Sequence, residues 1–259
     1  MKIRREGAWA LGTACRNVTA AAMLAGVLAA CGGGDLAASA PAFPPHQAPK
    51  DIGGGVWVVM GSSTAAGAGA STGNGWAALL QGAYGSLGVQ IVNIAKGGSV
   101  TYEGRSVTAT VREAAWRPKA DPNANVDQAL SRRPALLIVS YPTNDISKGY
   151  SADEVVNNVL EIRAHALAAG VPVLVTSTQP RDLPEAALAQ LLAIDQGLAA
   201  AVGPCFVEVR QVLIGADGKL APAFDSGDGL HLNDQGHQRI FSRLRQAIDS
   251  GLCVKVSSS

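Results

Sequence analysis

Short apolar runs alternate with longer helical patterns from residue 51 onward. The apolar runs are nearly continuous in Val, Ile and Leu, which is typical of strands buried on both faces of a sheet. They predict five strands, at residues 56–60, 89–94, 135–141, 171–176 and 206–209. Because helical patterns separate the runs, we expect parallel strands with right-handed crossovers, in a three-layer α/β/α sandwich.

Start and stop signals place the helices. Ser151 is a favourable N-cap for a helix over residues 152–169, and Pro184 suits the first turn of a helix that extends to residue 202. A last helix is expected to begin at Asn233. Residues 101–125, between the second and third strands, are polar and are consistent with either a lid over a substrate or an ordinary surface excursion.

The N-terminus differs from the rest of the chain. Lys2, Arg4, Arg5 and Arg16 precede an uncharged stretch at residues 17–30 that is too short to span a bilayer comfortably. Residues 1–30 are therefore interpreted as an export signal. The stretch ends in Leu-Ala-Ala-Cys31, which resembles the lipobox of bacterial lipoproteins. This favours lipidation of Cys31, and a membrane-anchored lipoprotein of the periplasm or outer membrane, over ordinary cleavage after an Ala-x-Ala-like site.

Composition divides the remaining chain into a tether and a domain. Residues 31–50 are rich in Gly, Pro and small side chains and are expected to be flexible, whereas residues 51–259 suffice for one domain. The signal contains four of the 21 Lys and Arg and one of the 20 Asp and Glu, which leaves 17 basic and 19 acidic residues and a net charge of −2. No basic patch stands out, so nucleic acid is not an expected partner, and membrane contact is expected only through the lipid anchor.

Two cysteines remain once the signal residue Cys15 and the anchor residue Cys31 are set aside. In an oxidising compartment, Cys205 and Cys253 favour a disulfide that would fix the C-terminal tail to the last predicted strand; two buried free thiols are the alternative. No Cys or His cluster has the spacing of metal ligands, so no metal is expected.

Three short segments carry the side chains that nucleophilic acyl transfer requires. They are GSSTAAG at residues 61–67, PTND at 142–145 and DGLHLN at 228–233. Each follows a predicted strand or precedes the last helix, and α/β proteins place their sites at that edge of the sheet. Together they offer a serine, an amide and an Asp–His pair. The glycines after the serine lack a Gly-Lys-Ser/Thr ending and do not fit G-x-G-x-x-G, which argues against nucleotide binding.

In this order the segments, together with NIAKGG at residues 93–98, resemble the sequence blocks of the SGNH (GDSL-type) hydrolases over most of the predicted domain. The resemblance implies a flavodoxin-like α/β fold and serine-esterase chemistry without a cofactor. It implies Ser63 as the nucleophile, His231 as the base and Asp228 as the residue that orients the base. The oxyanion donors would be the backbone N–H groups of Ser63 and Gly98 and the side-chain amide of Asn144.

Some positions depart from the family pattern. Ser62 stands where the family usually has Asp, so two adjacent serines are candidates, and the strand-to-helix register favours Ser63. Pro142 replaces the usual glycine of its block. A second Asp-x-x-His sequence, at residues 234–237, lies in the opening turns of the last helix, which favours His231 in the preceding loop as the base.

The hypothesis is a serine esterase that hydrolyses a short-chain acyl ester, on a carbohydrate or another cell-envelope substrate, through an acyl-enzyme intermediate. An acyltransferase with the same triad and a non-catalytic SGNH-fold binding lipoprotein are the alternatives. The expected partner is a small-molecule or glycan ester, and the oligomeric state is left open. Four aromatic side chains could stack on a sugar or pack within the domain: Trp76, Tyr102, Trp116 and Tyr141.

Overall fold

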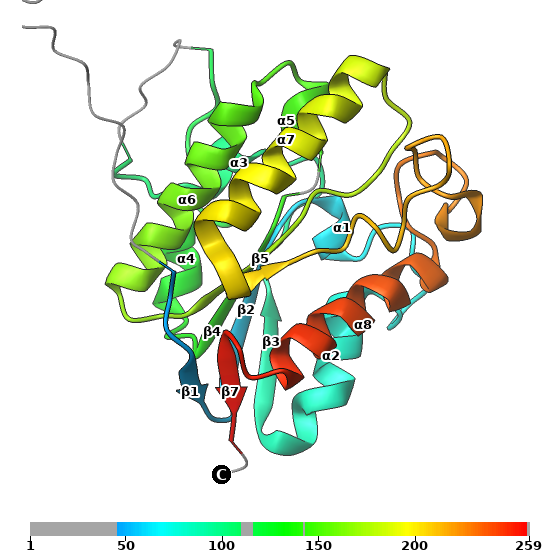
Figure 1. Ribbon diagram of the computed structural model, residues 1–259. Helices are drawn as coiled ribbons and strands as arrows, with labels where there is room; N and C mark the ends of the chain where they lie inside the picture. Colours follow the sequence, from blue (N-terminus) through cyan, green and yellow to red (C-terminus); the bar gives the residue numbers. More distant parts are fainter. Residues whose placement is uncertain (1–45, 110–115, 142, 258–259) are drawn as a thin grey trace, which may run out of the picture. The chain divides into compact units, whose positions relative to one another are not determined.

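The computed structural model describes residues 46–109, 116–141 and 143–257 of the chain. At the centre of this part is a five-stranded parallel sheet (Figure 1). Its strands, in spatial order, are β3 (Val89–Asn93), β2 (Gly55–Gly61), β4 (Leu136–Ser140), β5 (Val173–Thr176) and β6 (Phe206–Val207). The predicted α/β class and the parallel direction of the strands are confirmed, and each observed strand overlaps its predicted range.

The central strands are largely apolar because helices cover both of their faces. All five residues of β4 are buried. The register places Gly61, the last residue of β2, opposite Ser140, the last residue of β4. A Cβ atom at Gly61 would lie 1.9 Å from the Ser140 carbonyl oxygen, and Gly61 has a φ of +155°, so only glycine fits here. The segments that leave β2 and β4 therefore start side by side.

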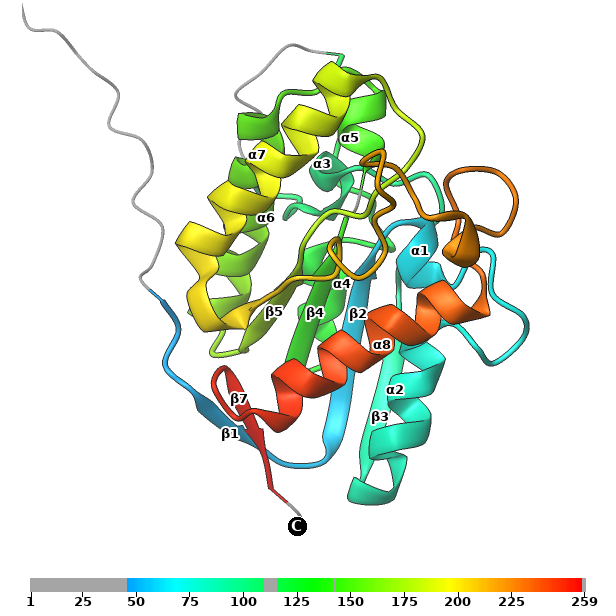
Figure 2. The same cartoon turned by 45° about the vertical axis from the view of Figure 1, so that its right-hand side comes forward.

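Helices on both faces complete the expected three-layer sandwich. Figures 1 and 2 show α6 (Ala152–Ala168) and α7 (Glu185–Val202) on one side of the sheet, with α2 (Trp76–Tyr84) and α8 (Asp234–Asp249) on the other. Ser151 caps α6 in a capping box, and the Asn233 side chain caps α8. The three predicted helices are confirmed, whereas α2 was not assigned from the sequence.

Shorter elements occupy the connections. Three of them lie beyond the carboxyl ends of the strands (Figure 2): α1 (Ser63–Ala66), α3 (Thr101–Gly104) and α5 (Asn144–Ser147). A further short helix, α4 (Val126–Ser131), precedes β4. The 3₁₀ turns are η1 (Gly85–Leu87), η2 (Gly203–Cys205) and η3 (Pro222–Phe224).

Arg117 is one of several residues that connect the described part of segment 101–125 to the domain. Its guanidinium forms an ion pair with Glu154, on the first turn of α6. It also lies 3.8 Å from the ring centroids of both Trp116 and Tyr150. Trp116 remains 66% exposed in this arrangement.

Segments from both ends of the described chain form a second sheet. β1 (Lys50–Ile52) pairs in parallel with β7 (Val254–Val256). Before β1, the Gln47 side-chain oxygen accepts from the Val173 N–H (3.0 Å), and His46 Nε2 lies 3.0 Å from the Ala200 carbonyl oxygen. The boundary expected between tether and domain at residue 50 therefore lies inside paired structure. The expected export signal, Cys31 and residues 32–45 lie outside the described residues.

Cys205 and Cys253 are joined by a disulfide, with Cα atoms 4.9 Å apart. Cys205 immediately precedes β6, and Cys253 immediately precedes β7. The bond therefore lies near the amino end of β6, whereas the candidate catalytic segments follow the carboxyl ends of their strands.

By length and composition, α7 with the following turn (Glu185–Cys205) is apolar enough to cross a membrane. Within the domain, its Leu191, Ile194 and Leu198 side chains are buried in the core. Its Asp195 carboxylate accepts hydrogen bonds from the N–H (2.6 Å) and hydroxyl (2.9 Å) of Thr178, just after β5. These contacts are those of a helix that packs on the sheet.

Candidate active site

The segment that leaves β2 exposes one of its two serines. Ser62 is only 1% exposed, and its N–H donates to the Ser140 carbonyl oxygen at the end of β4 (3.2 Å). Ser63, the first residue of α1, is partly exposed. Because a nucleophile must reach its substrate, side-chain exposure favours Ser63 over Ser62.

Asp228 and His231 form a hydrogen-bonded pair in the loop before α8. His231 Nδ1 lies 2.6 Å from Asp228 Oδ2, and Asp228 Oδ1 accepts from the N–H groups of His231 (2.7 Å) and Leu230 (3.0 Å). The backbone hydrogen bond from His231, followed by the contact with its ring, lowers the pKa of Asp228 to about 2. An ionised carboxylate only accepts, so a neutral His231 carries its proton on Nδ1. Its Nε2 lone pair is then available to take a proton from a hydroxyl.

A buried glutamine joins the serine segment to the Asp–His loop. Gln179, which follows β5, is 1% exposed and accepts a hydrogen bond from the Thr64 hydroxyl (2.7 Å). Its amide nitrogen donates to the Leu230 carbonyl oxygen (2.7 Å). Thr64 is the neighbour of Ser63, and Leu230 is the neighbour of His231, so one side chain fixes the separation of the two segments.

The same segments also meet through their backbones at Gly69. A Cβ atom there would lie 2.3 Å from the Leu232 carbonyl oxygen, and Gly69 has a φ of +87°. A larger residue at Gly69 would therefore force apart the chain that follows Ser63 and the chain that follows His231.

Two of the three candidate oxyanion donors, Gly98 and Asn144, lie on the segments that leave β3 and β4. Asn144, the first residue of α5, donates from its side-chain nitrogen to the Ser99 carbonyl oxygen (2.9 Å). An amide group has two N–H donors, so the second remains for a substrate. Gly98, next to Ser99, has a φ of +78° in the exposed turn.

Asp145 forms a second connection between the segments that carry Gly98 and Asn144. The buried carboxylate accepts from the Thr101 N–H (3.1 Å) and hydroxyl (2.6 Å), two residues beyond Ser99. Burial raises the pKa of Asp145 to about 6, although the hydrogen bonds from Thr101 act in the opposite direction. The structure thus ties the loop with Gly98 to the helix with Asn144 at two points.

The segments that carry Ser63, Gly98 and Asn144 therefore leave three adjacent strands at one edge of the sheet, and Gln179 connects the Asp228–His231 loop to them. Comparison with known proteins agrees with this arrangement. The model of the GDSL-like lipase/acylhydrolase family matches residues 59–239, which include the five candidate residues. The chain belongs to this family.

Solved structures of the family's fold are similar at low sequence identity. TesA covers 76% of this chain and 99% of its own, with a TM-score of 0.58 at 19% identity. A GDSL-like lipase from Bacteroides thetaiotaomicron covers 76% and 89%, with a TM-score of 0.53 at 19% identity. An acetyl xylan esterase covers 74% and 99%, with a TM-score of 0.55 at 15% identity. No curated protein matches the chain. At these identities the likeness concerns the fold.

The second Asp-x-x-His sequence of this family member has a structural role. His237 is fully buried, with Nδ1 accepting from the Trp76 N–H (3.4 Å) and Nε2 3.1 Å from the Ala68 carbonyl oxygen. Burial lowers the pKa of His237, which favours the neutral ring that these contacts require. Asp234 accepts instead from Ser71 and Asn74.

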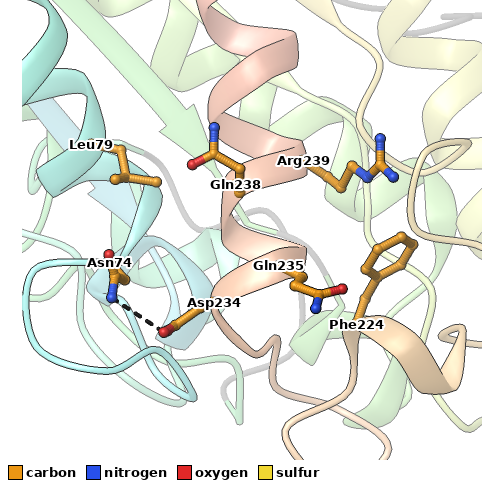
Figure 3. A pocket seen from close by; sticks show the side chains of 7 residues that line it. All are labelled: Asn74, Leu79, Phe224, Asp234, Gln235, Gln238 and Arg239. Carbon is orange, nitrogen blue, oxygen red and sulfur yellow. Dashed lines mark hydrogen bonds between the residues drawn. The ribbon is translucent and has the colours of Figure 1, made fainter.

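Asp234 also borders a groove of about 420 Å³ between α2, α8 and η3 (Figure 3). Asn74 points toward Asp234 on one side, while Phe224 and Arg239 line the other. The groove contains neither Ser63 nor His231 among its lining residues. Among the residues that the structure describes, no group of three or more His, Cys, Asp or Glu side chains could hold a metal ion.

The residues of the loop after β5 that contact the candidate catalytic segments lie outside the sequence motifs and were not predicted. Gln179 contacts both the serine segment and the Asp–His loop, and Arg181 donates to side chains of the segment around α5. The Asp182 N–H donates to the Gly229 carbonyl oxygen (3.0 Å). A usable signal existed, because these polar residues also follow a buried strand at the carboxyl edge of the sheet.

Proposed function

We propose that this protein is a serine esterase that acts through an acyl-enzyme intermediate. Ser63 Oγ attacks the ester carbonyl carbon while His231 Nε2 accepts the serine proton. Asp228 holds the imidazole in the required tautomer and stabilises the imidazolium that forms. The His231 imidazolium returns the proton to the leaving alcohol, and water then hydrolyses the acyl-serine by the same route.

The observation that carries the proposal is the hydrogen-bonded Asp228–His231 pair, together with the Gln179 bridge from its loop to the segment that carries Ser63. The ionised Asp228 orients His231, and the buried Gln179 links the neighbours of His231 and Ser63. The N–H groups of Ser63 and Gly98 and the Asn144 amide would stabilise the oxyanion that forms on the carbonyl oxygen. Family membership supports acylhydrolase chemistry in general terms.

For the substrate we propose a short acyl ester on a carbohydrate or another cell-envelope molecule. Of the four aromatic residues that could stack on a sugar, Trp76, Tyr102 and Tyr141 are buried. Trp116 is 66% exposed and rests on Arg117, so it is the one with a free ring surface.

Hydrolysis of 4-nitrophenyl acetate, butyrate and octanoate tests the esterase proposal. We expect the acetate and butyrate to be the better substrates, and expect Ser63→Ala and His231→Ala to lose activity. Ser62→Ala is the matched control and retains activity, because the Ser62 hydroxyl is buried. A folded Ser63→Ala variant that turns over these esters at the wild-type rate would remove Ser63 from the mechanism. Acyl transfer to an added sugar that exceeds hydrolysis would indicate an acyltransferase instead.

We also propose that the protein is exported and anchored through a lipid on Cys31. The proposal rests on the basic residues and apolar stretch of residues 1–30 and on the lipobox-like ending at Cys31. Metabolic labelling with palmitate and membrane fractionation test it. The full-length protein is expected to be labelled and membrane-bound, and Cys31→Ala to lose both properties. An unlabelled wild-type protein would contradict lipidation.

A further inference from the structure

Arg181 connects the loop after β5 to the segment that carries Asn144. It lies on the loop after β5, two residues beyond Gln179. Its Nη1 is 3.4 Å from the hydroxyls of Thr143 and Ser147, which flank Asn144 in the segment around α5. The next residue along the chain, Asp182, is bonded through its N–H to the Asp228–His231 loop. The guanidinium therefore lies beside the segment that carries Asn144, close enough to Asp228 for the two charges to interact.

The hydrogen-bonding capacity of Arg181 is incompletely used. Its Nε is buried and has no hydrogen-bond partner among the described residues, and its two Nη1 contacts are long. Arg105 and Arg117, in contrast, have carboxylate oxygens within 2.7 Å. No carboxylate of the described chain lies within ion-pair distance of Arg181.

The acidic side chains near Arg181 already have other hydrogen-bond or ion-pair partners. Asp228 attracts Arg181 electrostatically, but its oxygens accept from the ring and N–H of His231 and from Leu230. Asp182 forms its ion pair with Lys219. Burial lowers the pKa of Arg181 and the charge of Asp228 raises it, yet a guanidinium remains charged in proteins. The site thus retains a partly desolvated cation without a matching anion.

A second cation lies on the same side. Lys148, at the end of α5, donates to the Gly98 carbonyl oxygen (3.2 Å), and no ion pair forms at Lys148 among the described residues. This positive side of the site contrasts with the net negative charge of the chain after the predicted signal. An uncompensated cation next to the reacting groups is suited to recognise an anionic substrate.

We propose that Arg181 binds an anionic oxygen group of the substrate, a carboxylate or a phosphate, so that the enzyme prefers esters with a negative charge near the scissile bond. The inference rests on the proposed esterase function and specifies its substrate class. The planar guanidinium presents paired N–H donors that match both groups.

Two pairs of esters, each with an anionic and a neutral member, test the proposal. On the acyl side, the pair is 4-nitrophenyl hydrogen succinate and its neutral methyl ester. On the alcohol side, it is 3-carboxy-4-nitrophenyl acetate and 4-nitrophenyl acetate. We expect wild-type kcat/KM to favour the anionic member of at least one pair after correction for intrinsic reactivity. In Arg181→Met this preference should fall by about 10- to 100-fold, the range of a charged hydrogen bond. The rate on the neutral ester measures separately any loss from the Thr143 and Ser147 contacts.

Two further variants separate recognition from structural damage. Arg181→Lys keeps the charge without the planar fork and is expected to retain part of the preference. Arg132→Met, at the amino end of β4, removes an exposed arginine remote from the site and is expected to change neither rate. Inhibition of 4-nitrophenyl acetate hydrolysis by succinate and by inorganic phosphate, compared in wild type and Arg181→Met, distinguishes the two anion classes.

The outcomes distinguish this inference from the proposed function. Turnover of neutral and anionic esters with equal losses in Arg181→Met would refute anion recognition and leave the esterase standing. Absence of turnover by the wild type on every ester would refute the esterase. Calorimetric binding of the charged and neutral succinate esters to Ser63→Ala, with and without Arg181→Met, would still decide whether Arg181 recognises the charge.

Discussion

At the scale of single residues, the candidate side chains depend on neighbours outside the sequence motifs. Asn144 is oriented by the Ser99 carbonyl oxygen. Asp145, the next residue, is fixed by Thr101. The motifs therefore identify which groups react, whereas contacts between distant loops determine where those groups point.

Replacing Asn144 measures its contribution to the oxyanion. Asn144→Ala should reduce kcat by about 10²–10³, with KM little changed, because an oxyanion donor acts in the transition state. Stopped-flow and steady-state hydrolysis of 4-nitrophenyl acetate would measure both constants. Asn158→Ala is a suitable comparison, because Asn158 contacts Thr101 and lies outside the proposed oxyanion hole. A near-wild-type kcat in Asn144→Ala would exclude it as an oxyanion donor.

Two buried carboxyls should make stability depend on pH. Burial raises the pKa of Asp195 to about 6, against the hydrogen bonds from Thr178, and the pKa of Asp145 is raised similarly. Below pH 3.8, the ordinary pKa of an aspartic acid in the unfolded chain, each carboxyl is protonated in both the folded and the unfolded state. Its full contribution to the free energy of unfolding is therefore present there. Between pH 4 and 6 only the unfolded state releases the proton, and each group should lower the free energy of unfolding by up to about 3 kcal/mol.

Asp195→Asn provides the check. Urea unfolding of wild type and variant at pH 4, 5, 6 and 7 should give a difference in unfolding free energy that shifts in favour of the variant as pH rises. In both proteins, Asp145 would account for the remaining dependence of the unfolding free energy on pH. A difference that stays constant over this range would mean that Asp195 ionises normally in the folded state.

At the scale of elements, the sequence predicted the strands and the long helices because their patterns are local. β4 is a continuous apolar run, and α6 begins at a capping box. β1 and β7 have three residues each and are stabilised by pairing across the chain, which no local pattern reveals. The same distinction applies to the site. Asp228 and His231 are three residues apart and readable as a motif, whereas Gln179 contacts residues 115 and 51 positions away.

The Gln179 bridge can be tested for a role in positioning. Gln179→Met keeps the side-chain volume but removes both hydrogen bonds, and Thr64→Val removes only one of them. We expect Gln179→Met to lower kcat by about 10- to 100-fold, because small displacements of reacting groups are costly, and to change KM little. Thr64→Val should have a smaller effect of the same kind, and the two effects should not add in the double variant.

Chemical denaturation separates positioning from stability. Loss of two buried hydrogen bonds should destabilise Gln179→Met by about 1–3 kcal/mol per unsatisfied group. If kcat of the fully folded variant equals that of the wild type, the bridge stabilises the domain without positioning Ser63 and His231.

At the scale of the whole described chain, the first and last described segments pair with each other, away from the carboxyl ends of the strands where the candidate site lies. β1 pairs with β7, Gln47 contacts both Val173 and Cys253, and the disulfide joins Cys253 to Cys205. The candidate catalytic groups, in contrast, lie at the carboxyl ends of the strands. This separation suggests that stability and catalysis can be altered independently.

The disulfide tests this independence. It closes a segment with a sequence separation of 48 residues, for which loop-closure entropy gives about 4 kcal/mol at 25 °C and typical measured values are about 2–4 kcal/mol. The double variant Cys205→Ser/Cys253→Ser should therefore have a free energy of unfolding lower by about that amount, measured by urea denaturation of both proteins. Reduced wild-type protein is the matched comparison, because it loses the bond but keeps the sulfur atoms.

Well below its unfolding transition, the double variant should hydrolyse 4-nitrophenyl acetate with the wild-type kcat, since the bond lies near the amino end of β6. A lower kcat in the fully folded variant would show that the fastening of the chain ends also controls the geometry of the Ser63–His231 site.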